Sequence, residues 1–189
     1  MLALLRLWTF SQCTTVVLSL IYLLFKWGYY YALLSITLGF AIVQFKSKQV
    51  NENTLYLALV LFYFTQKPLS ATLVPFASYS LFHALKALPT KNSYSLQLLN
   101  YQPQALVFSC QWEISTLFPL SIVYVFMGYT TLLTPVVLFF FIKQRSLYSP
   151  LFKSTLTQSL AQLQQWSPLA LKPFIDKVSA FLLPTVIQK

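Results

Sequence analysis

The sequence predicts an all-α integral membrane protein, with about four to six apolar helical segments in hairpins and C-terminal amphipathic helices after them. Of its 189 residues, 57% are hydrophobic and only 8% are charged, whereas about 25% are charged in a soluble domain. Most of the charged residues lie between long apolar runs. They are also mostly basic, with 13 Lys and Arg against 3 Asp and Glu, which is typical of topology signals and of contact with anionic lipid headgroups.

The same composition argues against several function classes. No basic, aromatic-interleaved face accompanies the positive charge, so we expect no nucleic-acid partner. Cys13 and Cys110 lie in apolar segments without CxxC or metal-ligand spacing, and we interpret them as small buried hydrophobic residues. With 3 glycines, the chain has no glycine-rich phosphate loop. We therefore expect no cofactor and no metal.

The first predicted hairpin is formed by Leu7–Phe25 and Trp27–Phe45, each nineteen uncharged residues long. Such a length spans a hydrocarbon core of about 30 Å. The turn at Lys26 is short, so the two segments must run antiparallel. Because the first run lacks a small-residue cleavage site before its end, it is expected to be an uncleaved signal anchor.

The middle pair is shorter. Thr54–Gln66 has thirteen apolar or polar uncharged residues, too few to cross comfortably, and Leu69–Lys86 is interrupted by Pro75. The pair is either re-entrant or two short tilted spans. A proline frees a backbone carbonyl, which in lipid must be satisfied by neighbouring protein or by local polar side chains. The side chains available for this are Ser70, Thr72, Ser78 and Ser80.

A polar loop is predicted over Pro89–Gln102, and two further spans over Pro103–Ile142. Met127–Tyr129 is their expected turn, and Pro119 and Pro135 are expected to kink the two arms.

This arrangement predicts a topology. If the N-terminus faces the cytosol, eleven of the thirteen basic residues are cytosolic, and only Lys26 and Lys67 lie at the opposite turns. That agrees with the positive-inside rule. Both termini are therefore predicted to be cytosolic.

The chain from Leu147 has a different character, which predicts a membrane domain over residues 1–145 and a cytosolic amphipathic tail over residues 146–189. Two helical stretches, separated by Ser167-Pro168, each gather their apolar side chains on one face. The predicted membrane-inserting face consists of Phe152, Leu156, Leu160, Leu163, Trp166, Leu171, Phe174, Ile175, Val178, Phe181 and Leu182. The alternative is that this face packs on the membrane domain or on a partner protein.

The polar face of the first tail helix is rich in Ser, Thr and Gln rather than in Lys and Arg. Such a helix gains little from headgroup charge and must insert apolar side chains. We therefore expect it to prefer loosely packed, curved lipid.

Glu113 is an acidic residue inside an apolar segment, where a charge is expensive and commonly functional. The candidate partners for an intramembrane polar contact are His83 and Lys86. A structural pair is favoured over a proton path. Because the chain has a single histidine and three acids and lacks a G-x-S-x-G elbow, we expect no enzymatic activity.

The central stretch is the distinctive one. Leu73–Leu88, LVPFASYSLFHALKAL, resembles the Pro-Phe…Ser-Leu-Phe-His core of the transmembrane protein 33 family, which includes a pore-membrane nucleoporin and its endoplasmic-reticulum paralogue. The matching central motif consists of Pro75, Phe76, Ser80, Leu81, Phe82 and His83. Tyr29–Lys46, Phe139–Leu163 and Ser167–Leu182 are similar to the family's first hairpin, its last membrane segment with the following helix, and its closing helix.

The resemblance implies a multi-pass, non-enzymatic protein of the endoplasmic reticulum membrane and nuclear envelope. It implies a role in shaping or organising curved membrane and in nuclear pore distribution or assembly. The implied partners are the lipid bilayer and membrane proteins of the reticulon or nuclear pore type. The tail is less basic than in better-known members, which argues against an importin-type contact there. The alternative function is an adaptor subunit of a larger membrane enzyme or receptor complex.

Overall fold

The structure is a computed structural model that describes residues 2–47, 49–87 and 93–183. The described residues form helices and no strand, which confirms the all-α prediction. The helices are α1 (Leu2–Phe25), α2 (Tyr29–Ser47), α3 (Glu52–Tyr63), α4 (Ser70–Ala87), α5 (Ser93–Asn100), α6 (Gln102–Trp112), a π-helical turn (Glu113–Leu117), α7 (Phe118–Phe126), α8 (Leu133–Tyr148), α9 (Pro150–Trp166), a 3₁₀ turn (Leu169–Leu171) and α10 (Lys172–Leu182).

In the described part of the chain, two helical stretches are long and apolar enough to cross a membrane, Ala3–Phe25 and Gln102–Phe126. The first pairs with α2 through a tight turn in which Lys26 and Gly28 have positive φ. Ser35 Oγ donates to the Ser11 carbonyl at 2.8 Å. Gly39 lies so close to α1 that a Cβ there would come within 2.7 Å of Gln12 Nε2. Small residues at the contact therefore let the two backbones approach closely.

Pro75 lies inside α4, and the structure shows how its freed carbonyl is satisfied. The missing bond is the one to Ala71, four residues earlier. The Trp112 indole nitrogen of α6 donates to the Ala71 oxygen at 3.1 Å. A neighbouring helix therefore supplies the donor. The local serines do not, since Ser78 donates to the Val74 carbonyl instead.

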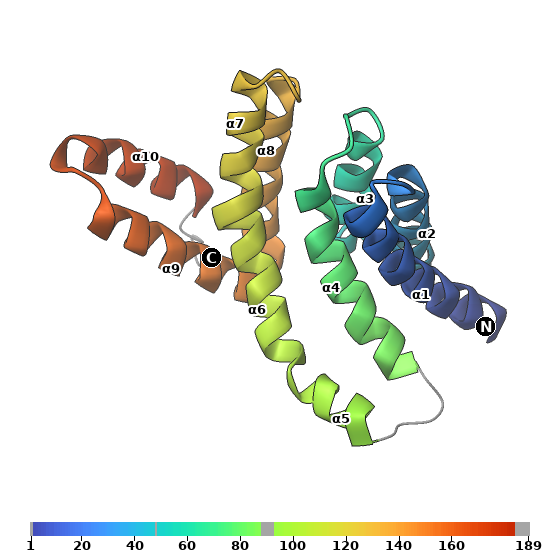
Figure 1. Ribbon diagram of the computed structural model, residues 1–189. Coiled ribbons are helices and arrows are strands. Elements are labelled where there is room, and N and C mark those ends of the chain that lie inside the picture. Colours follow the sequence, from blue (N-terminus) through green and yellow to red (C-terminus); the bar gives the residue numbers. More distant parts are fainter. Residues whose placement is uncertain (1, 48, 88–92, 184–189) are drawn as a thin grey trace.

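The predicted polar loop over Pro89–Gln102 is wrong in part, because Ser93–Asn100 forms α5; residues 88–92 lie outside the described residues. After it, α6, the π-helical turn and α7 run as one continuous rod (Figure 1). Pro119 has no N–H to donate to the Ser115 carbonyl, and the π-helical turn directly precedes it. Pro135 stands in the first turn of α8, where a proline is tolerated and does not kink the helix.

The helices form a ring. Going round it, α1 packs on α2, α2 on α3, α3 on α8, α8 on α9, α9 on α6, α6 on α4, and α4 back on α1. The helices α3 and α4 follow each other in the chain, but α3 packs mainly on α2 and α8, and α4 packs mainly on α1 and α6. At one end of the ring, Lys26 Nζ donates to Ser70 Oγ at 3.2 Å and Lys67 Nζ reaches the Gly128 carbonyl at 3.5 Å. The turns that carry the two predicted lumenal lysines therefore lie at the same end of the bundle.

The tail forms a helical hairpin of α9 and α10 that projects sideways from the end of α8 (Figure 1). It is docked on the ring through its base: α9 contacts α6 and α8, and α10 contacts α8. Ser146 Oγ bonds the Leu182 carbonyl at 2.9 Å, and the rings of Phe139 and Phe181 stack with centroids 5.4 Å apart. Side chains from α9 and α10 therefore belong to the same core as side chains from the preceding helices.

Candidate functional site

The ring of helices surrounds a pocket, and the start of α3 forms one of its walls. Asn51 caps this helix: its side-chain oxygen accepts from the Asn53 and Thr54 backbone N–H groups at 3.0 and 3.4 Å, while Thr54 Oγ1 accepts from the Asn51 N–H. This reciprocal cap fixes where the helix begins. Glu52 is thereby held in the first turn, where the helix dipole favours a negative charge.

Arg145, in the last turn of α8, is the centre of the site and is only 2% exposed. Its Nε donates to Glu52 Oε1 at 2.7 Å, and one terminal nitrogen forms an ion pair with Glu113 Oε2. The other terminal nitrogen donates to the Tyr79 hydroxyl at 2.8 Å and approaches Cys110 Sγ at 3.7 Å. One guanidinium thus ties together four other helical segments.

Aromatic rings cover the guanidinium. Its central carbon lies 4.7 Å from the ring centroid of Tyr56 and 4.3 Å from that of Phe152. Phe152 is held at this place by the cap of α9, since Ser149 Oγ accepts from the Phe152 N–H and Pro150 occupies the first helical position. Stacking on rings and forked hydrogen bonding are the two properties in which arginine differs from lysine. Lysine could not replace Arg145 here.

Glu113 opens the π-helical turn and is 3% exposed. Both carboxylate oxygens have partners: Oε2 receives Arg145, and Oε1 accepts from the Tyr56 hydroxyl at 2.9 Å. The predicted partners, His83 and Lys86, are therefore not the ones in the structure. They lie near the end of α4, and the ring of His83 packs edge-on against Trp8, with centroids 5.3 Å apart. Glu113 is accordingly a fully paired structural charge.

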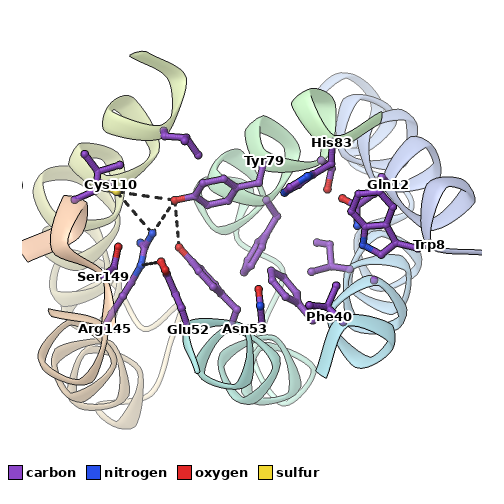
Figure 2. A pocket seen from close by; sticks show the side chains of 18 residues that line it. Trp8, Gln12, Phe40, Glu52, Asn53, Tyr79, His83, Cys110, Arg145 and Ser149 are labelled. Carbon is purple, nitrogen blue, oxygen red and sulfur yellow. Dashed lines mark hydrogen bonds and ion pairs between the residues drawn. The ribbon is translucent and has the colours of Figure 1, made fainter. Parts of the chain in front are cut away.

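The pocket has a volume of about 360 Å³ and is lined from α1, α2, α3, α4, α6 and the α8–α9 junction. Figure 2 shows the Arg145 cluster on one side and Trp8 with Gln12 on the other, with Glu52 and Asn53 between them. The lining is mainly apolar and aromatic with a few polar groups, which is typical of a ligand site. The central motif contributes Phe76, Ser80 and His83 to it.

The rest of the central motif packs the helix. Pro75, Phe76, Ser80 and Phe82 are buried, whereas Leu81 and His83 are exposed. The tail face is divided in the same way. Phe152, Leu156, Ile175 and Leu182 are buried in the protein and cannot insert into lipid, Leu160 and Val178 are half-buried, and Leu163, Trp166, Leu171, Phe174 and Phe181 are exposed.

The arrangement offers little for catalysis. In the described residues, no group of three or more His, Cys, Asp and Glu side chains comes together as a metal site. Glu113, which does not line the pocket, has both of its oxygens occupied. The site can hold charge in place and can present an aromatic, partly polar wall to a bound molecule.

Sequence reasoning misses Arg145 as a functional residue, because a basic residue after an apolar run predicts a cytosolic topology signal. A signal was present: Arg6 and Arg145 are the arginines of the chain, and two of its three acids stand in or beside apolar segments. Arginine is the usual partner of a buried carboxylate. Tyr56 and Tyr79 were missed as well, since apolar segments contain many tyrosines and only packing selects two of them.

The comparisons with known proteins agree with the resemblance. The comparison with curated proteins and the comparison with solved structures gave no match. The sequence profile of the family described as Transmembrane protein 33/Nucleoporin POM33 matches residues 2–183, nearly the whole chain. The chain belongs to this family of membrane proteins.

Proposed function

We propose that this protein is a non-enzymatic membrane protein of the endoplasmic reticulum and nuclear envelope that shapes or organises curved membrane and supports nuclear pore distribution or assembly. The family supports the membrane location and, through its printed name, the association with nuclear pores. The observation that carries the shaping role is the tail hairpin, whose free end presents large apolar side chains away from the protein core.

The free end lies around the connection between α9 and α10. The exposed side chains there are Leu163 (53%), Trp166 (85%), Leu169 (83%), Leu171 (51%) and Phe174 (66%). Complete removal of one such side chain from water favours the membrane-bound state by about 1.5–3 kcal/mol. The nearby acid, Asp176, accepts from Gln164 Nε2 at 2.6 Å, so it is held along the hairpin. A bilayer interface is the environment that would cover this end of the hairpin.

The position of the hairpin gives the insertion its direction. Its base is tied to the end of α8 that lies opposite the turns carrying Lys26 and Lys67. In the predicted topology this end is cytosolic, so insertion would enlarge the cytosolic leaflet alone. The short α3, with 12 residues, would likewise occupy one leaflet more than the other. Both effects favour positive curvature.

The test uses the full chain, because the buried Phe152 and Leu156 tie the tail to the ring. The protein is reconstituted in liposomes of endoplasmic-reticulum phospholipids, and tubules are counted by cryo-electron microscopy. A Trp166→Gln, Leu169→Gln variant is expected to lose most tubulation while inserting normally. Trp27→Gln is the matched control, since Trp27 is 61% exposed at the opposite turn. Equal tubulation by all three proteins would refute the proposed role of the hairpin.

A further inference from the structure

The pocket inside the ring has a charge pattern that selects among ligands. Arg145 and Glu113 neutralise each other, and Glu52 adds one further negative charge to the wall. Among the Asp, Glu, Lys and Arg residues of the described chain, Glu52 and Arg145 line the pocket, and Glu113 pairs with Arg145 without lining it. These three side chains together carry a net charge of −1, although the protein as a whole is at +10.

Arg145 is not available to hold an anion. Its Nε and both terminal nitrogens already donate to Glu52, Glu113 and Tyr79. Aromatic rings lie against its guanidinium. A phosphate or carboxylate entering the pocket would meet a guanidinium whose three nitrogens each already donate to a neighbour, and the Glu52 carboxylate beside it would repel the anion.

Glu52 is the charged group that remains open. Its Oε1 receives Arg145, while no hydrogen bond or ion pair within the described residues reaches its Oε2. Its side chain keeps 33% of its surface exposed. An open carboxylate oxygen at the edge of an otherwise neutralised cluster attracts a cation.

The wall beside Glu52 is built from aromatic rings. Phe40 and Tyr56 stack with centroids 5.3 Å apart, and Phe76 lies edge-on to both, at 6.0 and 5.6 Å. Tyr79 continues the row at 5.9 Å from Tyr56. Aromatic faces are negative, and aromatic side chains are the usual receptors of quaternary ammonium groups.

Polar side chains aimed into the pocket are left without partners. Ser80 is 6% exposed and lines the pocket, yet none of the described residues forms a hydrogen bond with its hydroxyl. The side-chain amides of Gln12 and Asn53 line the pocket in the same state. Gln12 and Asn53 are half-buried, so together with Ser80 they offer polar contacts to an occupant that also has an apolar body.

We propose that this pocket binds an amphiphile through an ammonium headgroup of the choline type, with the ammonium between Glu52 and the rings of Phe40 and Phe76. The lining residues place the pocket near the end of the bundle where α2 and α4 end and α3 begins. Lipid headgroups lie at this level of a membrane protein. Its volume of about 360 Å³ is at the lower end of ligand pockets, roughly 300–1,000 Å³, and accommodates a headgroup and the start of a chain.

The test is native mass spectrometry of the full chain in a maltoside detergent with two lysolipids of equal chain length. Lysophosphatidylcholine is expected to be retained at one molecule per protein, and lysophosphatidylglycerol, which lacks the ammonium, at least tenfold less. Glu52→Gln keeps an oxygen for Arg145 and is expected to weaken choline lipid binding about tenfold. Asp176→Asn, which removes an exposed acid of the tail, is the matched control and is expected to bind normally.

Two further arms complete the test. Ser80→Met narrows the pocket without changing charge and is expected to lower retention of the choline lipid, with an unchanged melting temperature showing that the variant folds. Tetramethylammonium as a competitor separates the sources: displacement at low concentration indicates a small soluble ammonium compound, and displacement only at high concentration indicates a lipid. Equal binding of the two lysolipids, or unchanged binding by a folded Glu52→Gln variant, would overturn the proposal.

Discussion

Replacing Arg145 by Met is expected to destabilise the protein by roughly 3–5 kcal/mol, the usual cost of removing one partner from a buried ion pair. Met has a similar length and leaves no large cavity. The cost comes from Glu113, which is 3% exposed and would keep only the Tyr56 hydroxyl, 2.9 Å away. Glu52 contributes less, because 33% of its side chain is exposed.

The size of this effect can be converted into a measurable shift. Since about 1.4 kcal/mol corresponds to a factor of ten, the ratio of folded to unfolded protein should fall by roughly two to three and a half powers of ten. Chemical unfolding in detergent measures the global change. Maleimide labelling of Cys110, 1% exposed beside Arg145, reports the local one. A Cys13→Ser background removes the other thiol.

Two comparisons isolate the cause. Lys153→Met removes a half-buried cation of α9 that no carboxylate in the described chain contacts, and is expected to change stability by less than about 0.5 kcal/mol. Adding Glu113→Gln to Arg145→Met removes the orphaned charge and should restore much of the loss, giving a coupling energy of about 0.5–3 kcal/mol in a double-mutant cycle. An Arg145→Met protein that unfolds and labels like the wild type would refute the reasoning.

Three other substitutions test the packing around the pocket. Gly39→Leu, where α1 and α2 lie close together, is expected to lower the free energy of unfolding by about 1–3 kcal/mol through overpacking. Ala58→Leu, on the exposed side of α3, should leave it nearly unchanged. Denaturant unfolding measures both variants. Leu156→Ala, at 1% exposure, is expected to cost about 2–5 kcal/mol, and Leu163→Ala, at 53% exposure, almost nothing; equal losses would mean that the tail is not docked through its base. Asn51→Ala removes the cap of α3 and should lower the melting temperature, with a loss of about 1 kcal/mol, while Asn51→Asp should retain it.

Much of the helical layout could be predicted from the sequence, because long uncharged runs bounded by Lys, Arg or Pro leave a chain in lipid few alternatives. The segment Leu69–Lys86 appears as α4 at Ser70–Ala87, with Pro75 inside. α5 was missed because Ser, Asn and Gln favour loops when judged by composition alone. The π-helical turn at Glu113 could not be foreseen, since the register of backbone hydrogen bonds has no signature in residue types.

The site was less predictable than the helices. An apolar sequence indicates that a segment is buried in lipid or protein, but it does not indicate which helix packs against it. The packing of α3 on α8 therefore could not be predicted from the sequence. The sequence predicts His83 and Lys86 as partners of Glu113, whereas the structure pairs it with Arg145, which lies beyond the predicted end of the last span at Ile142. The indole of Trp112 was overlooked for the same reason: its contact with Ala71 depends on how two helices cross.

The contacts of Arg145 with Glu52, Tyr79, Cys110 and Phe152 can form only late in synthesis. Its contacts join residues 93, 66 and 35 positions apart, and Phe152 arrives last. While the ribosome is still translating α8, the nascent chain already holds Glu52 and Glu113 without their cation. These two carboxylates can therefore reach their native pairing only after Arg145 has been synthesised, and a chain truncated before Arg145 keeps both of them without their cation.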